Sequence, residues 1–286
     1  MIADTAIAMT LAGSDSGGGA GIQADLKTFS ALGVFGASVI TALTAQNTRE
    51  VRAILPIPAD FIRSQIQAVL DDLNVAAIKV GMLGDVATIE CVAKALSEYP
   101  ARPIVLDPVM IAKSGDALLQ GDAINSLRSL LLPRASLITP NLPEAARLTD
   151  RPEPSTVQQM HDLLPALHSL TDAAILLKGG HLQNLNQESG NQAIDLFSDG
   201  TQVIELTSVR YNTGNTHGTG CTLSSAITAF LARQMTLPDA VRAGKHYISN
   251  AIKTADQLKV GSGHGPVNHF HEWWHQDSNN PSYIPN

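Results

Sequence analysis

Short apolar, β-branched runs alternate with stretches of helix length along most of this chain, and this alternation limits the possible folds more than any other feature. Six runs carry the pattern: IAMTLAG (7–13), ASVITALTAQ (37–46), AAIKVGM (76–82), RPIVLDP (102–108), ASLITPN (135–141) and AAILLKGGH (173–181). Strands that are buried on both faces and joined by helices pair in parallel. The sequence therefore predicts an α/β fold, with a mostly parallel central sheet covered by helices on both faces.

Other segments complete this picture. Apolar residues at helical spacing between Ile62 and Leu73 predict a helix that begins near Pro58. The segment NQAIDLFSDGTQVIEL (191–206) predicts a hairpin at one edge of the sheet, and two long helices follow, one from near Gly218 and one from Pro238 to Leu258. We find no internal repeat and no linker. We expect one domain over residues 1–276 and a disordered tail over 277–286.

Composition excludes several classes of partner. The 286 residues carry a net charge of −7, and the 19 Lys and Arg residues are scattered, so nothing indicates binding to nucleic acid or to an anionic membrane. No apolar run approaches the ~20 residues needed to span a bilayer. Cys91 and Cys221 are the only cysteines, and no basic-then-apolar leader is seen, which favours a reducing, cytoplasmic setting. A small-molecule substrate fits best.

Polar side chains and glycines follow the apolar runs, at the points where the predicted strands end. Ligands bind beyond the carboxyl ends of the strands in open parallel sheets, so these residues are the first candidates for a site. They are Gly13, Asp15, Gln46, Asn47, Gly81, Met82, Asp107, Thr139, Asn141, Lys178, Gly179 and Gly180. The set offers glycines for close approach, carboxylates for a metal, a lysine for phosphate, and an amide and a thioether for a small organic ring.

The segment GSDSGGGAG (13–21) is rich in glycine directly after the first run. Such a cluster marks unusual backbone dihedrals or close approach to a ligand, with a flexible connection as the alternative. Gly19, Gly21 and Ala24 have the G-x-G-x-x-A spacing of dinucleotide sites, but the acidic residue expected about 20 positions further on is missing. No P-loop motif is present. Asp25, on the helix that follows, either binds substrate or interacts with the helix dipole.

The segment THGTGCTLSSAI (216–227) is the most specific local signal. Gly218, Thr219 and Gly220 stand where an amphipathic helix begins, so their backbone N–H groups and the positive helix end predict an anion site. Cys221 falls in the first turn. It is either a thiolate stabilised by the helix terminus or an inert, buried thiol.

Two acidic residues are candidates for a hard cation. Asp107 ends a strand, and Glu144 follows Asn141 by three residues at a helix start. Mg²⁺ takes one or two carboxylates together with waters and phosphates, although Glu144 has the alternative of a helix-dipole partner. Lys178 closes a buried strand before two glycines and is expected to face an anion. The histidines of HFHEWWH (269–275) lack metal-ligand spacing and are interpreted as surface or packing residues.

Eight segments, in this order, resemble the motifs of the hydroxymethylpyrimidine/phosphomethylpyrimidine kinases of thiamine biosynthesis, which belong to the ribokinase-like superfamily. They are GSDSGGGAGIQADLKT, TALTAQNT, KVGML, LDPVM, LITPNLPEA, LLKGGH, NTHGTGCTLSSAI and GPVNHFHEWW. The resemblance runs from about Ile7 to Trp274. It implies a three-layer α/β/α sandwich without a developed lid, a homodimer, and the use of ATP and Mg²⁺. The implied reaction phosphorylates 4-amino-5-hydroxymethyl-2-methylpyrimidine and then its monophosphate.

The resemblance also implies roles for individual residues. Gln46 would hydrogen-bond the aminopyrimidine edge, and the rest of that pocket would be Gly13, Asp25, Thr44, Met82 and Val109. The anion site would be Gly218, Thr219, Gly220 and Cys221, with Cys221 where the wider superfamily has an aspartate base. The metal and the phosphates would be held by Asp107, Asn141 and Glu144, and Lys178 would reach the nucleotide phosphates.

One departure from the family and three alternative functions follow from the same residues. Position 44 is Thr where many relatives have an aliphatic residue, so the polarity of the pocket differs there. A pyridoxal or pyridoxine kinase shares the fold. A non-catalytic pyrimidine-binding protein would not need Asp107, Lys178 and the GTGC segment. A dinucleotide oxidoreductase is weakened by the missing ribose-binding acid. Lys245, on the last long helix, is a candidate to flank the nucleotide.

Overall fold

The computed structural model describes residues 5–111, 118–119, 121–180, 182 and 192–274. Within this part of the chain the strands form one nine-stranded sheet in the order β3-β2-β1-β4-β5-β6-β7-β8-β9. Their bounds are β1 (Ile7–Asp15), β2 (Phe35–Gln46), β3 (Val51–Pro56), β4 (Ala77–Val80), β5 (Ile104–Leu106), β6 (Leu137–Ile138), β7 (Ala174–Lys178), β8 (Gln192–Ser198) and β9 (Val203–Val209). All pairs from β2 across to β7 are parallel, which confirms the predicted strand runs.

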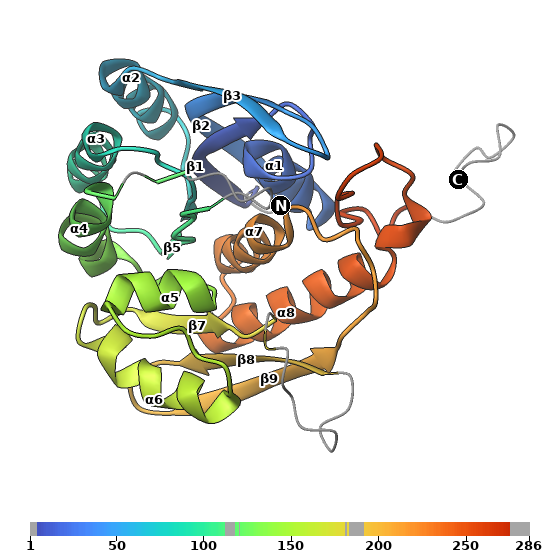
Figure 1. The fold of residues 1–286 in the computed structure, drawn as a ribbon. Coiled ribbons are helices and arrows are strands. Elements are labelled where there is room, and N and C mark those ends of the chain that lie inside the picture. The colour runs from blue at the N-terminus through green and yellow to red at the C-terminus, as the bar shows by residue number, and fades with distance from the viewer. Residues whose placement is uncertain (1–4, 112–117, 120, 181, 183–191, 275–286) are drawn as a thin grey trace, which may run out of the picture.

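Helices cover both faces of this sheet (Figure 1). Their bounds are α1 (Gly21–Ala31), α2 (Ala59–Leu70), α3 (Val86–Ser97), α4 (Ala123–Ser126), α5 (Leu142–Thr149), α6 (Val157–His168), α7 (Thr219–Ala232) and α8 (Leu237–Lys253). One apolar core lies between the sheet and α2 to α6, and a second lies between the sheet and α1, α7 and α8. The three-layer α/β/α architecture expected from the sequence is therefore correct.

The two edges of the sheet are antiparallel. The hairpin of β8 and β9 forms one edge, as predicted, and Gly200 in its turn has a φ of 87°. The other edge is β3, which pairs with the end of β2 and which the sequence did not predict. Its residues are mostly exposed, so it lacks the buried alternation by which a strand is recognised.

Helix boundaries follow the predictions closely, with one exception. Helix α2 is capped by Pro58, and α7 begins one residue after Gly218. Helix α8 ends at Lys253, earlier than predicted, and a 3₁₀ turn (Ala255–Gln257) follows it. None of the helices in the described residues has both the length and the apolar character that crossing a bilayer requires. The tail predicted over 277–286 lies outside the described residues.

Candidate active site

A cavity of about 760 Å³ opens at the carboxyl edge of the parallel strands. The cavity extends from the glycine-rich loop after β1 to the β8–β9 hairpin. It therefore crosses most of the sheet, because β1 and the hairpin lie far apart in the strand order. Nearly all the predicted site residues line it: Gly13, Thr44, Gln46, Met82, Asp107, Val109, Asn141, Glu144, Lys178, Gly218, Thr219, Gly220 and Cys221. Among the residues to which the resemblance gives a role, Asp25 is the exception. Four further candidates at strand ends do not line the cavity either: Asn47, Gly81, Thr139 and Gly179.

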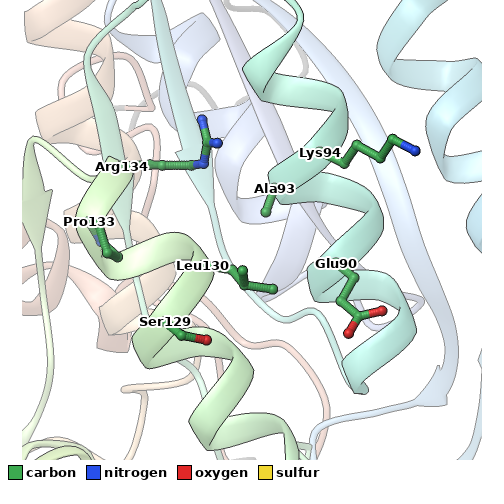
Figure 2. A pocket seen from close by; sticks show the side chains of 7 residues that line it. All are labelled: Glu90, Ala93, Lys94, Ser129, Leu130, Pro133 and Arg134. Atoms are coloured by element: carbon green, nitrogen blue, oxygen red, sulfur yellow. The ribbon is translucent and has the colours of Figure 1, made fainter.

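A second hollow, of about 540 Å³, lies between α3 and the turns around residues 127–134 (Figure 2). Its lining residues are Glu90, Ala93, Lys94, Ser129, Leu130, Pro133 and Arg134. None of them stands at the carboxyl end of a strand. This hollow therefore lies away from the strand ends that carry the predicted site residues, and it is not the candidate site.

The glycine-rich loop between β1 and α1 is built around the carboxylate of Asp15. Backbone N–H groups of Gly17, Gly19 and Ala20 donate to it over 2.8, 3.1 and 2.9 Å. His217, from the segment before α7, lies 2.8 Å from the same carboxylate. Burial alone would raise the pKa of Asp15, but the contacts with His217 and the loop outweigh this and lower it. The loop is thus a defined structure rather than a flexible connection.

The loop also fixes the end of β2, where Gln46 faces the cavity. The Ser16 hydroxyl donates to the Gln46 carbonyl over 2.8 Å and accepts from the Gln46 N–H over 2.9 Å. The Thr44 hydroxyl lies 2.9 Å from the Ser14 carbonyl. Met82 approaches from the end of β4, where a Cβ on Gly13 would come within 3.0 Å of its sulfur. Three segments, from the ends of β1, β2 and β4, therefore converge on one end of the cavity.

Asp25 lies beneath this end of the cavity rather than in its wall. It is fully buried, with its carboxylate 2.5 Å from the ammonium of Lys79. Ser225 and Thr10 donate to it as well, each over 2.6 Å. Asp25 is therefore held from three sides by protein groups, and the contact with substrate that the resemblance implies for it stays a prediction. Lys79 itself lines the cavity.

The start of α7 forms the floor of the cavity. Gly218 caps the helix with a φ of 79°, and no side chain caps it, so the first N–H groups of α7 lack a side-chain partner. A Cβ on Gly218 would stand 1.8 Å from the Gly19 carbonyl oxygen, which means that the two glycine loops pack backbone against backbone. Free N–H groups at a positive helix end are an anion site.

Of the two interpretations left open for Cys221, in the first turn of α7, its surroundings favour a buried thiol over a thiolate stabilised by the helix start. Burial, and the carboxylates of Asp25 and Asp107, raise the pKa of Cys221 to about 11 against the lowering effect of Lys79. The thiol is therefore protonated at neutral pH. The helix terminus is only one of several charges here, and the acidic ones were not visible from the local sequence.

A cation and a carboxylate stand beside the helix start. Lys178, at the end of β7, lies 3.0 Å from Asp107, which also accepts hydrogen bonds from Thr139 and Ser224. Burial alone would lower the pKa of Lys178 and raise that of Asp107, but their attraction reverses both shifts. Both are therefore charged. A Cβ on Gly220 would come within 3.4 Å of the Lys178 ammonium, so this cation faces the helix start directly.

Asn141 and Glu144 form a capping box at the start of α5. The Asn141 side chain accepts from the Glu144 N–H, and the Glu144 carboxylate accepts from the Asn141 N–H, each over 2.8 Å. Burial and the nearby charge of Asp107 raise the pKa of Glu144 to about 7, although Lys178 acts in the opposite direction. Glu144 thus caps its helix and also faces the cavity. The two interpretations left open by the sequence are compatible.

Sequence reasoning missed three residues of the cavity wall or its support. Lys79 is a charged residue inside β4, a strand in which every residue is buried, and that position was a usable signal. His217 directly precedes Gly218, but its contact with Asp15 spans 202 positions and has no local signature. Asp195, on β8, forms an ion pair of 2.6 Å with Lys245 and accepts from the Gly179 N–H. Lys245 itself lines the cavity, as expected.

The histidines near the C-terminal end act in packing within the described residues. His269 is buried, and its ring lies 3.1 Å from the Thr222 hydroxyl on α7. Burial lowers the pKa of His269 to about 3, so its ring is neutral. Among the described residues, no group of three or more His, Cys, Asp or Glu side chains is placed to hold a metal ion. His275 lies outside them.

This arrangement of an anion site, a facing lysine and a ring-sized pocket suits the transfer of a phosphoryl group to a small molecule. The architecture is that of the ribokinase-like kinases. Comparison with known proteins then gives the family. The family model described as phosphomethylpyrimidine kinase matches residues 15–268, and the chain belongs to this family.

Individual relatives agree. The hydroxymethylpyrimidine/phosphomethylpyrimidine kinase of Rhizobium meliloti is 52% identical over 94% of this chain and 99% of its own length. The crystal structure of a phosphomethylpyrimidine kinase from Clostridium difficile is 41% identical, with a TM-score of 0.74 over 86% of this chain and 99% of its own. An ADP complex of pyridoxal kinase from Bacillus subtilis is 37% identical, with a TM-score of 0.84 over 93% and 98%.

Proposed function

We propose that this chain is an ATP-dependent kinase that phosphorylates 4-amino-5-hydroxymethyl-2-methylpyrimidine and then its monophosphate. The observation that carries the proposal is the cavity, in which Gln46 and Lys178 both stand near the start of α7, a helix start that no side chain caps. A ring bound at Gln46 presents its substituent to the helix start. The family relatives named for both phosphorylations support the same conclusion.

Phosphoryl transfer requires alignment and stabilisation of charge, with little covalent chemistry from the protein. We assign the negative charge that develops to the N–H groups of Gly218, Gly220 and Cys221 at this helix start, because no side chain caps it. The Thr219 N–H instead donates to the Thr216 carbonyl over 3.3 Å. Lys178 adds a positive charge on the opposite side, held in place by Asp107. Thr44, Met82, Val109 and Gly13 enclose the ring beside Gln46.

The two reactions differ in the proton that must leave. The first acceptor is an alcohol, which loses a proton during the transfer, whereas the second is a phosphate oxygen that is already anionic. Cys221 is the ionisable group at the start of α7 that lines the cavity. We assign to its thiolate the role of the base that accepts the proton of the alcohol in the first reaction. Its high pKa makes the thiolate scarce at neutral pH but strongly basic.

The residues present fit a magnesium ion that arrives with the nucleotide. Asp107 and Glu144 both face the cavity, and Mg²⁺ binds through one or two carboxylates together with waters and substrate phosphates. Bound there, the ion would neutralise charge on the transferred group. Asn141, which shares the capping box with Glu144, orients that carboxylate and is placed to contact phosphate.

The far end of the cavity suits the base of the nucleotide. Apolar side chains line it from the hairpin edge and from α8: Ala193, Val209, Ile248 and Ile252. Lys245 is held there by its ion pair with Asp195. The relative from Bacillus subtilis was crystallised with ADP, which supports nucleotide binding in this fold. We therefore assign this end to the adenosine group of ATP.

The proposal is tested by incubating the purified protein with ATP, Mg²⁺ and the pyrimidine alcohol, and following the monophosphate and diphosphate by mass spectrometry. Formation of both products supports it, and formation of neither overturns it. The Cys221→Ala variant tests whether the two phosphorylations depend on the thiol to different degrees. It should slow the first phosphorylation much more than the second, whereas an equal loss in both would make Cys221 only a part of the anion site.

A pyridoxal kinase activity is the second candidate, because a pyridoxal kinase matches this fold with a TM-score of 0.84. The kinase family named for the pyrimidine substrate, however, includes relatives with higher identity. We expect kcat/KM to be larger for the pyrimidine alcohol than for pyridoxal. The reverse order, measured with the same preparation, would make pyridoxal the physiological substrate.

We further propose a homodimer that forms through the β3 edge. Large apolar side chains are exposed on β3 and on the first turn of α2 that follows it, with Leu55 at 62% and Phe61 at 60%. Exposed apolar patches of this kind mark protein interfaces. Light scattering should give twice the chain mass of 30.2 kDa, and Leu55→Lys should give the monomer.

Both cysteines are free thiols, which is consistent with a reducing, cytoplasmic setting.

A further inference from the structure

On the Thr44 side of the Gln46 side chain, hydrogen-bond donors and acceptors do not match. The Thr44 hydroxyl lies 2.9 Å from the Ser14 carbonyl and 3.2 Å from Oε1 of Gln46. Both neighbours are acceptors, but a hydroxyl carries a single proton. The closer and better acceptor is the backbone carbonyl. The hydroxyl oxygen then turns a lone pair towards Gln46, where only a donor would be stabilising.

A second imbalance lies on the other side of the same amide. Nε2 of His217 is 2.8 Å from the Asp15 carboxylate and 3.4 Å from Nε2 of Gln46. Asp15 is ionised, so it accepts, and the imidazole nitrogen must carry the proton. That nitrogen cannot also accept a hydrogen bond. An N–H of Gln46 directed at it would place donor against donor.

One half-turn of the amide removes both imbalances. With its nitrogen towards Thr44, Gln46 donates to the hydroxyl oxygen, which in turn donates to Ser14. With its oxygen towards His217, Gln46 shares the imidazole proton with Asp15. The oxygen and nitrogen of an amide are assigned from the hydrogen-bond network, and this network has one consistent solution.

We propose that Thr44 and the Asp15–His217 pair lock the side-chain amide of Gln46 in this orientation and thereby set the ring specificity of the site. This inference rests on the proposed function. Each end of the locked amide keeps one free valence for a ligand: the second N–H on nitrogen and the second lone pair on oxygen. The site therefore selects a ring edge that has an acceptor and a donor side by side.

A 4-aminopyrimidine has this edge, because its N3 accepts and its amino group donates. The corresponding 4(3H)-pyrimidinone has the reverse pattern, with a donor at N3–H and an acceptor at the carbonyl. It is nearly the same in size and shape. A locked amide must discriminate between the two compounds, whereas an amide that can turn over accepts both by exchanging its ends. Thr44 is thus a specificity-determining residue.

The test compares kcat/KM for the aminopyrimidine alcohol with that for 5-hydroxymethyl-2-methylpyrimidin-4(3H)-one. Thr44→Val keeps the shape of the side chain but removes the hydroxyl, and Thr44→Ser is the matched control that keeps it. We expect the ratio of kcat/KM values to fall about five-fold in the valine variant, the equilibrium effect of one neutral hydrogen bond, and to be retained in the serine variant. If the valine variant does not fold, Thr44→Cys, which is close in size and a poor hydrogen-bond partner, replaces it.

The result is decisive in each direction. A lower ratio with valine or cysteine but not with serine supports the lock, and a ratio that is unchanged or higher with valine overturns it. Calorimetric titration of each ring compound into the ATP-free protein gives the same comparison without catalysis. If the wild-type protein phosphorylates neither compound, the proposed function fails, while the ratio of the two dissociation constants still tests the orientation of Gln46.

Discussion

The ammonium group of Lys79 lies 2.5 Å from the carboxylate of Asp25, and neither side chain has any exposed surface. Lys79 comes from β4 and Asp25 from α1, and Ser225 of α7 donates to the same carboxylate oxygen. The pair therefore joins a strand at the centre of the sheet to the two helices that begin at the cavity. Its position makes it a support for both glycine loops.

This arrangement predicts strong coupling between the two residues in stability. Lys79→Met leaves the Asp25 charge buried without a cation, and removal of one partner of such a pair costs about 3–5 kcal/mol. Adding Asp25→Asn removes that charge, so the double variant should be more stable than the Lys79→Met variant alone. Urea unfolding of the wild type, both single variants and the double variant measures the coupling. Additive losses would show that the two groups do not depend on each other.

The thiol of Cys221 gives a prediction that is independent of activity. Its pKa of about 11 means that the thiolate fraction, and with it the rate of alkylation, rises about ten-fold per pH unit through the neutral range. Iodoacetamide labelling at pH 7 and pH 9, followed by mass spectrometry in a Cys91→Ser background, measures this rise. A rate that is already constant above pH 7 would instead indicate a thiolate stabilised by the start of α7.

The sequence was sufficient for the fold because each buried strand of the parallel sheet is a mostly apolar run. The ends of these runs then located Gly13, Gln46, Asp107 and Lys178 at one edge of the sheet without knowledge of tertiary contacts. Strand β3 was missed for the same physical reason, since an exposed edge strand has no buried face to leave a period in the sequence.

The electrostatics of the site could not be predicted in this way. The pKa of Cys221 depends on charges from three other elements, which the local helix start does not reveal. Asp25 lies on α1, the helix where the sequence placed it, but its partner Lys79 is 54 positions away. The Asp15–His217 contact spans 202 positions. Local pattern identifies which residues face inwards, whereas the partner that each one meets is a property of the folded chain.

His269 predicts a specific loss of stability in acid. Its pKa falls from an ordinary 6.5 to about 3 in the folded protein because the ring is buried. Between these values the unfolded chain binds a proton that the folded protein does not, so stability decreases as the pH falls below 6.5. At pH 5 the loss from this group is about 2 kcal/mol. The contribution is fully present above pH 6.5.

His269→Gln removes this titration, and denaturant unfolding at pH 5.0 and pH 7.5 isolates it. The loss of stability between the two conditions should be smaller in the variant than in the wild type by about 2 kcal/mol. Other groups titrate equally in both proteins and cancel in the comparison. The same difference in both proteins would mean that His269 becomes protonated in the folded state without penalty.

The contact between the two glycine loops predicts that Gly218 tolerates no side chain. A methyl group there would meet the Gly19 carbonyl at 1.8 Å, and the φ of 79° is unfavourable for any residue with a Cβ. Gly218→Ala must therefore displace either the start of α7 or the loop around Asp15, and a shift of about 1 Å in such a site costs about 100-fold in kcat/KM. Gly214→Ala is the control, because among the described residues nothing lies within 4 Å of its Cβ position. Steady-state kinetics of the two folded variants, checked by circular dichroism, decide the matter: equal activities would show that the loops can separate without effect on the anion site.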